Sequence, residues 1–189
     1  ATGNATVTAS VTVNAKPTYS PIDLRVLPNY GCKLVATTPS FTTFDLDNGN
    51  TPFGCYGFSA GTHRGEFTIT GMASPFFVGV HVGKGEYTAT DSPVVLGFAM
   101  PNTSSVSVLA DGTYWVEYDA GTGAYAIGKV GGATLDSGTL ALPGGNLARL
   151  VISTDYVQSA RVKCNFGNEA WVGTPTMGYT GVPFPTTSV

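Results

Sequence analysis

Charge is scarce in this chain. Only 11% of its 189 residues are Asp, Glu, Lys or Arg, against roughly 25% in an average soluble domain, and the formal net charge is −3. The 9 basic residues occur singly along the sequence, so they form no patch that could follow a phosphate backbone. We therefore expect no nucleic-acid partner.

Long hydrophobic runs are missing as well. A helix that crosses a bilayer needs about 18 to 20 consecutive apolar residues, whereas the most apolar runs, such as residues 75–80, are short and interrupted by Gly. We expect no insertion into a membrane. A length of 189 residues suffices for one sizeable core, so we expect a single β domain.

Cysteine is rare, and its spacing excludes a metal clip or a disulfide-dense scaffold. The 3 cysteines, Cys32, Cys55 and Cys164, leave at least one unpaired. Cys32 and Cys55 could be cross-strand partners, and the sequence leaves open whether they are bonded. Cys164 stands in an alternating segment, which favours a small buried hydrophobic residue over a nucleophile.

Short segments that alternate apolar and polar residues are abundant. Residues 5–13 alternate in this way, which predicts a half-buried strand, and Pro17, Pro21 and Pro28 then mark an extended connector. We therefore predict an extended N-terminal arm over residues 1–22, packed on the domain edge or on a neighbouring subunit. Residues 23–189 are predicted to form the β-sandwich.

Turn-forming sequences such as Asp47-Asn-Gly49, Asp111-Gly112 and Pro143-Gly-Gly145 separate the predicted strands. Ten or more short strands without a helical period indicate an all-β, antiparallel two-sheet sandwich. Beyond the arm, strands are predicted over residues 32–37, 41–46, 65–70, 76–82, 94–100, 105–109, 112–118, 124–128, 147–153 and 158–166.

Four motifs resemble landmarks of SPRY domains. Residues 59–70, with Gly61, Glu66 and Phe67, resemble that family's Ser-Gly-Lys-His-Tyr-Trp-Glu-Val strand, and residues 77–80 resemble its Val-Gly-Val strand. Residues 112–123 resemble its Gly-Asp-Val-Ile-Gly-Val-x-x-Asp strand and turn, and residues 162–167 resemble its closing Val-x-x-Asn-Phe-Gly. The resemblance runs from about residue 24 to residue 182 and implies a concanavalin-like jelly roll.

The chain departs from animal SPRY domains at residues 124–132, where the family's Phe-Phe-x-Asn-Gly hairpin is not found. This departure weakens any inference of a specific peptide-binding pocket. The ending, in which Asn-Phe-Gly is followed by an aromatic residue, Pro and Gly-Tyr, is similar to SPRY-like modules of tailed-phage virion proteins. The resemblance therefore implies a decoration, fibre or spike component.

The Asn-Phe-Gly sequence also has a direct physical interpretation. It predicts a corner at which the Phe166 ring enters the core while Gly167 lets the backbone turn without a Cβ clash. Trp171 either closes the edge of the sandwich or belongs to an exposed binding platform, and its usual burial favours the first.

Glu117 and Asp119 would lie on one side of a strand, where paired carboxylates can act as acid and nucleophile, as in concanavalin-fold glycosidases. The third carboxylate of that pattern is missing, and Asp119 is better explained as the first residue of an Asp-x-Gly turn. His63 and His81 have no Gly-x-Ser-x-Gly sequence nearby. We therefore predict that the protein is not an enzyme.

Metal binding has one candidate. Residues 45–50 (Asp-Leu-Asp-Asn-Gly-Asn) alternate oxygen donors, but Gly49 is one place early for an EF-hand and Tyr56 replaces its last ligand. A solvated turn is the favoured interpretation, so we predict no metal site and no cofactor.

Binding and assembly remain, because sandwich loops rich in Gly, Ser, Thr, Asn and Tyr offer adaptable hydrogen bonding and aromatic contact area. The leading hypothesis is a non-enzymatic structural protein on the surface of a phage virion, with other virion proteins or copies of itself as partners. The alternatives are a lectin-like module that binds host-surface glycan and a glycosidase relative. The candidate binding residues, all expected in loops, are Tyr30, Tyr56, His63, Arg64, Tyr87, Asp91, Tyr125 and Trp171.

Overall fold

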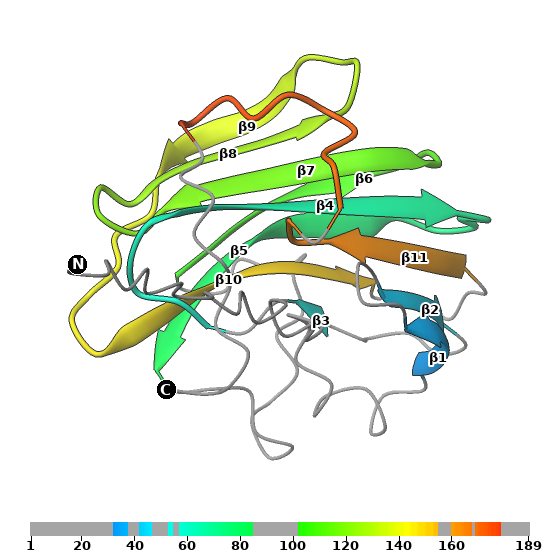
Figure 1. Cartoon of the computed structure of the whole chain (residues 1–189), viewed down its shortest axis with the longest axis horizontal. Helices are drawn as coiled ribbons and strands as arrows, with labels where there is room; N and C mark the ends of the chain where they lie inside the picture. The colour runs from blue at the N-terminus through cyan, green and yellow to red at the C-terminus, as the bar shows by residue number, and fades with distance from the viewer. Residues whose placement is uncertain are drawn as a thin grey trace, which may run out of the picture.

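The computed structural model describes residues 32–37, 42–46, 53–54, 57–84, 102–154, 160–167 and 169–178. These residues form two antiparallel β-sheets and no helix (Figure 1), which confirms the predicted all-β, two-sheet fold. No helix in these ranges could cross a membrane. The predicted arm, the strand expected over 94–100, the possible calcium loop and the Cys32–Cys55 pairing depend on residues or side chains outside the described part.

The larger sheet has seven strands in the order β1-β2-β11-β4-β7-β8-β9, and the smaller sheet has four in the order β3-β10-β5-β6. The strands are β1 (Cys32–Thr37), β2 (Thr42–Leu46), β3 (Phe53–Gly54), β4 (Thr62–Thr70), β5 (Phe76–Lys84), β6 (Thr103–Val108), β7 (Gly112–Asp119), β8 (Ala124–Lys129), β9 (Thr134–Thr139), β10 (Asn146–Thr154) and β11 (Ala160–Asn165).

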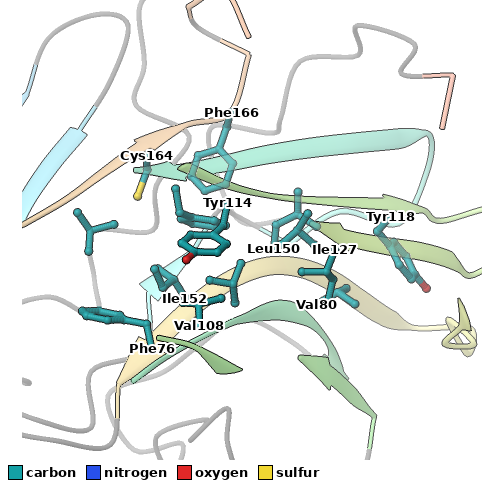
Figure 2. Packing of buried hydrophobic residues seen from close by; sticks show 14 of the residues in the cluster. Phe76, Val80, Val108, Tyr114, Tyr118, Ile127, Leu150, Ile152, Cys164 and Phe166 are labelled. Atoms are coloured by element: carbon teal, nitrogen blue, oxygen red, sulfur yellow. The ribbon is translucent and has the colours of Figure 1, made fainter. Parts of the chain in front are cut away.

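The core lies between the two sheets, and alternation along each strand selects its residues. Phe67 and Ile69 of β4 point into it from the larger sheet, as do Tyr114, Val116 and Tyr118 of β7. Figure 2 shows several of these side chains packed against residues of the smaller sheet. The smaller sheet contributes Phe76, Val78, Val80, Val82, Val108, Ala148, Leu150 and Ile152. Cys164 lies in the same cluster and is 2% exposed, as predicted.

The Asn-Phe-Gly corner has the predicted form. Phe166 packs edge-on against Phe67 with ring centroids 5.6 Å apart, and Gly167 has a φ of 92°, in the region that favours glycine. The side chain of Asn165 holds the turn, because its Oδ1 accepts the Gly167 N–H at 2.9 Å and its Nδ2 donates to the Ala170 carbonyl at 3.2 Å. The corner ends β11 and directs the chain onto the other face of the larger sheet.

Candidate functional site

The face of the larger sheet that points away from the core, called here the outer face, carries a group of three buried charged side chains. Arg64 and Glu66 of β4 alternate with the core residues of that strand, and so do Trp115 and Glu117 of β7. In the antiparallel register Arg64 is opposite Glu117, and Glu66 is opposite Trp115. Neighbouring strands therefore bring one guanidinium and two carboxylates together.

Arg64 bridges the two carboxylates. Its Nη2 lies 2.8 Å from Glu66 Oε1, and its Nη1 donates to Glu117 Oε1. The exposed fractions of the three side chains are 0%, 1% and 0% for Arg64, Glu66 and Glu117. Because a buried ion costs several kcal/mol unless its charge and hydrogen-bonding groups are satisfied, each carboxylate needs further donors.

Those donors come from residues 169–178, called here the strap. Figure 1 shows this segment, orange to red, leaving β11 and rising past β7 and β8. Glu66 accepts the N–H groups of Val172 and Gly173, at 2.9 and 3.0 Å. Glu117 accepts the Thr176 hydroxyl at 2.7 Å and the Met177 N–H at 2.8 Å, together with the Thr176 N–H at 2.9 Å. The two carboxylates thus fasten the strap to the sheet.

The strap lies along the outer face and bends at residues 172–173 and 176–177. Half-buried residues alternate with exposed ones: Trp171, Gly173, Pro175 and Met177 are half-buried, whereas Val172, Thr174, Thr176 and Gly178 are exposed. At Gly173 the strap backbone passes close to the Arg64 guanidinium, because a Cβ placed on Gly173 would lie 2.9 Å from Arg64 Nη2. Only glycine lets the strap backbone come so near the guanidinium without displacing it.

Two indole rings flank Arg64. Its guanidinium carbon is 5.1 Å from the centroid of the Trp115 ring and 5.5 Å from that of Trp171, distances within the range of cation–π attraction. Trp115 packs over Gly128 of β8, where a Cβ would lie 2.4 Å from the indole Cζ2. Because the Trp171 ring lies near the guanidinium of Arg64 on β4, Trp171 is part of the contact between the strap and the sheet.

The arrangement leaves little capacity for acid–base chemistry. Both oxygens of Glu117 already accept hydrogen bonds from Arg64 or from the strap. Asp119 starts the turn predicted for it, because its Oδ1 accepts the N–H groups of Gly121 and Thr122 at 2.7 and 3.1 Å. Glu117 and Asp119 therefore both have hydrogen-bond partners within the protein. For Asp119 this confirms the predicted Asp-x-Gly turn.

The predicted binding residues separate into different environments. Arg64 and Trp171 come together at the outer face. Tyr125 is half-buried on β8, and its hydroxyl donates to Asp136 Oδ2 at 3.1 Å. Tyr30, Tyr56, Tyr87 and Asp91 lie outside the described residues.

The prediction that His63 and Arg64 are loop residues is wrong. Both lie inside β4, and their exposed fractions are 1% and 0%. His63 points to the core side, where its ring is 4.1 Å from that of Phe58, and its Nε2 lies 2.9 Å from the Ala60 carbonyl oxygen. Burial lowers the pKa of His63, and the hydrogen bond to Ala60 opposes part of that shift. The strand begins at Thr62 because residues 62–64 pair with β7.

The smaller sheet carries a second polar group. His81 of β5 is opposite Arg149 of β10, and its Nδ1 lies 3.0 Å from the hydroxyl of Thr103 on β6. Burial, with a smaller contribution from the Arg149 charge, lowers the pKa of His81 from 6.5 to about 4. His81 is therefore neutral at physiological pH. Within the described ranges, no group of three or more His, Cys, Asp or Glu could hold a metal ion.

Comparison with known proteins gives structural likenesses alone. No family model matches the chain, and no curated protein matches it. It is similar to the SPRY domain of human HERC1, with a TM-score of 0.43 and 11% identity, over 78% of this chain and 97% of that one. It is also similar to a functionally unknown protein from Saccharomyces cerevisiae, with a TM-score of 0.43 and 10% identity, over 71% of this chain and 93% of that one.

Proposed function

We propose that this chain is a non-enzymatic assembly module, a β-sandwich that attaches to other virion proteins or to copies of itself on the surface of a phage particle. The observation that carries the proposal is the bonding of Glu117. This carboxylate was the strongest catalytic candidate, yet Arg64, Thr176 and Met177 already donate to it. A general acid or nucleophile must have an oxygen available for the substrate.

The composition of the chain supports an interaction role. Low charge and many Thr, Ser and Gly residues suit a protein that contacts neighbours through hydrogen bonds and small apolar areas. Leu109 and Leu135 are 76% and 50% exposed, and they lie after β6 and in the edge strand β9. The virion assignment rests on the motif resemblance and on the predicted arm.

Oligomeric state tests the proposal. We expect the full chain to form a homo-oligomer in size-exclusion chromatography with light scattering, and a chain lacking residues 1–20 to be monomeric but folded by circular dichroism. A full chain that is monomeric at all concentrations and binds no virion protein would contradict the assembly role.

Two further measurements address the alternatives. Saturable binding on a glycan array without turnover would replace the assembly role with a lectin role. Hydrolysis of any glycoside that is abolished in Glu117→Gln would replace it with catalysis, because Gln keeps the shape of Glu but cannot act as an acid. We expect a blank array and no hydrolysis by either protein.

A further inference from the structure

The strap adds nothing to the hydrophobic core. Among the described residues, every buried core side chain precedes it in the chain, from Phe58 to Phe166. Trp171 and Gly173 of the strap lie against Arg64 on the outer face, which is on the far side of the larger sheet from the core. Removing the strap from the sheet would therefore leave the contacts between the two sheets intact.

Attachment of the strap depends on two carboxylates. Four of its backbone N–H groups, those of Val172, Gly173, Thr176 and Met177, donate to Glu66 or Glu117. All four carboxylate oxygens are in use, because the Oε1 atoms also accept from Arg64. Glu66 Oε1 and both oxygens of Glu117 each accept two or more hydrogen bonds, so a proton on any of these three atoms would take the place of a donor that now binds there.

The chain also has a boundary where the strap could separate from the sandwich. Gly167, with its φ of 92°, and the Asn165 side chain form the corner between β11 and the strap. Phe166 before this corner is buried in the core, whereas Val172 after it is 67% exposed. Local opening commonly occurs in segments with few buried apolar contacts.

We infer that the strap is an acid-released latch: protonation of Glu66 or Glu117 frees residues 171–178 from the outer face while the β-sandwich stays folded. The proton comes from solvent and goes to a carboxylate oxygen, and the displaced strap N–H groups bind water instead. Release leaves the Arg64 guanidinium and the Trp115 ring on a sheet face that the strap no longer crosses.

The other charged groups near this latch each have a defined place. Arg64 faces both carboxylates from β4 and forms an ion pair with each. Lys163 of β11 pairs with Glu169 at the start of the strap, at 2.8 Å, and Asp119 on β7 binds its own turn. On β11 the residue opposite Glu66 is Asn165, and on β8 the residues opposite Trp115 and Glu117 are Gly128 and Ala126. None of these three directly opposite residues can titrate.

Hydrogen exchange measured by mass spectrometry on the full chain tests the latch. Glu66→Gln and Glu117→Gln imitate the protonated carboxylates at neutral pH. In each variant we expect the amides of residues 172–177 to exchange about tenfold or more faster, since charge-assisted hydrogen bonds are lost. Amides of β5 and β10 should keep their wild-type protection. In the wild type, acidification should produce the same selective loss after correction for the intrinsic exchange rate.

Glu169→Gln is the matched control. This substitution removes the charge of a strap carboxylate that pairs with Lys163 and whose side chain is 28% exposed. We expect unchanged hydrogen exchange at residues 172–177. Thr176→Ala removes one hydroxyl donor and provides a milder test, with a smaller rise at residues 176 and 177. The inference is overturned if the strap keeps its protection in both Gln variants. It is equally overturned if strap and sandwich amides lose protection together in the wild type on acidification.

Discussion

Arg64 on β4 lies directly opposite Glu117 on β7, and both side chains are fully buried on the side of the sheet that faces away from the core. Together with Glu66 they place two carboxylates and one guanidinium beneath the strap. A buried charge that loses its partner is far more costly than an exposed one. The three residues are therefore energetically coupled, and Arg64 is the member without a substitute.

Replacing Arg64 with Met should destabilise the protein by about 3 to 5 kcal/mol, because Glu66 and Glu117 would then be buried without a counter-charge. Arg64→Lys should lower the free energy of unfolding by less than Arg64→Met does, because the positive charge is kept. It should still be destabilising, because an ammonium group cannot reproduce the fork of donors that the guanidinium provides. Urea unfolding at neutral pH measures both changes. Lys163→Met is the control, because it breaks a partly exposed pair expected to contribute at most about 1 kcal/mol. Equal losses for Arg64→Met and Lys163→Met would refute the coupling.

Much of the fold could be predicted because strand residues repeat with a period of two. The predicted limits of β1 match the observed Cys32–Thr37, and the Asn-Phe-Gly corner has the predicted geometry. β9 was missed because its residues, Thr134–Thr139, are almost all exposed and include a single large apolar side chain, Leu135. Its position depends on pairing with β8, which one strand's sequence does not reveal.

The candidate site was harder to predict, because it depends on register. Arg64 and Trp171 were both selected from the sequence, but as separate loop residues. Nothing local shows that Arg64 is opposite Glu117, or that residues 172–177 return to β4 and β7 to satisfy the carboxylates. The one available signal was alternation: Arg64 and Glu66 have the same parity in a segment whose Phe67 and Ile69 point to the core.

Gly65→Ala should be destabilising by about 1 to 3 kcal/mol, the usual cost of an extra methyl group in a packed core. A Cβ at Gly65 would lie 2.7 Å from Cε1 of Phe166, so the Asn-Phe-Gly corner would have to move. Gly144→Ala is the control, because no atom lies within 4 Å of its Cβ and its φ is not positive; it should be neutral or slightly stabilising. Thermal unfolding compares the two variants. Similar melting temperatures would contradict the packing seen at Phe166.

Asn165→Ala should cost about 1 to 3 kcal/mol, because it removes a buried side chain, 6% exposed, that binds the Gly167 N–H and the Ala170 carbonyl. Asn165→Asp has the same shape and still accepts the Gly167 N–H, but it cannot donate to the Ala170 carbonyl. It also adds a carboxylate across from Glu66. We therefore expect Asp to be no better tolerated than Ala at neutral pH in urea unfolding. An Asp variant as stable as the wild type would show that the amide donor is dispensable.

His81 should make stability depend on pH between its unfolded and folded pKa values. The folded pKa is lowered from 6.5 to about 4, so between these values the unfolded chain binds a proton that the folded chain does not. The free energy of unfolding must then fall as the pH drops from about 6.5 to about 4, by up to about 3 kcal/mol from this group. His81→Asn removes this titration and should make the curve less steep from pH 6.5 to 5, where most carboxylates are still ionised. His63, whose pKa burial also lowers, contributes a slope of the same sign that remains. Thr103→Val, which removes the hydroxyl near His81 Nδ1 but keeps the imidazole, is the control and should retain the slope. Urea unfolding across this range measures all three proteins, and parallel curves for the wild type and His81→Asn would assign the pH dependence to other groups.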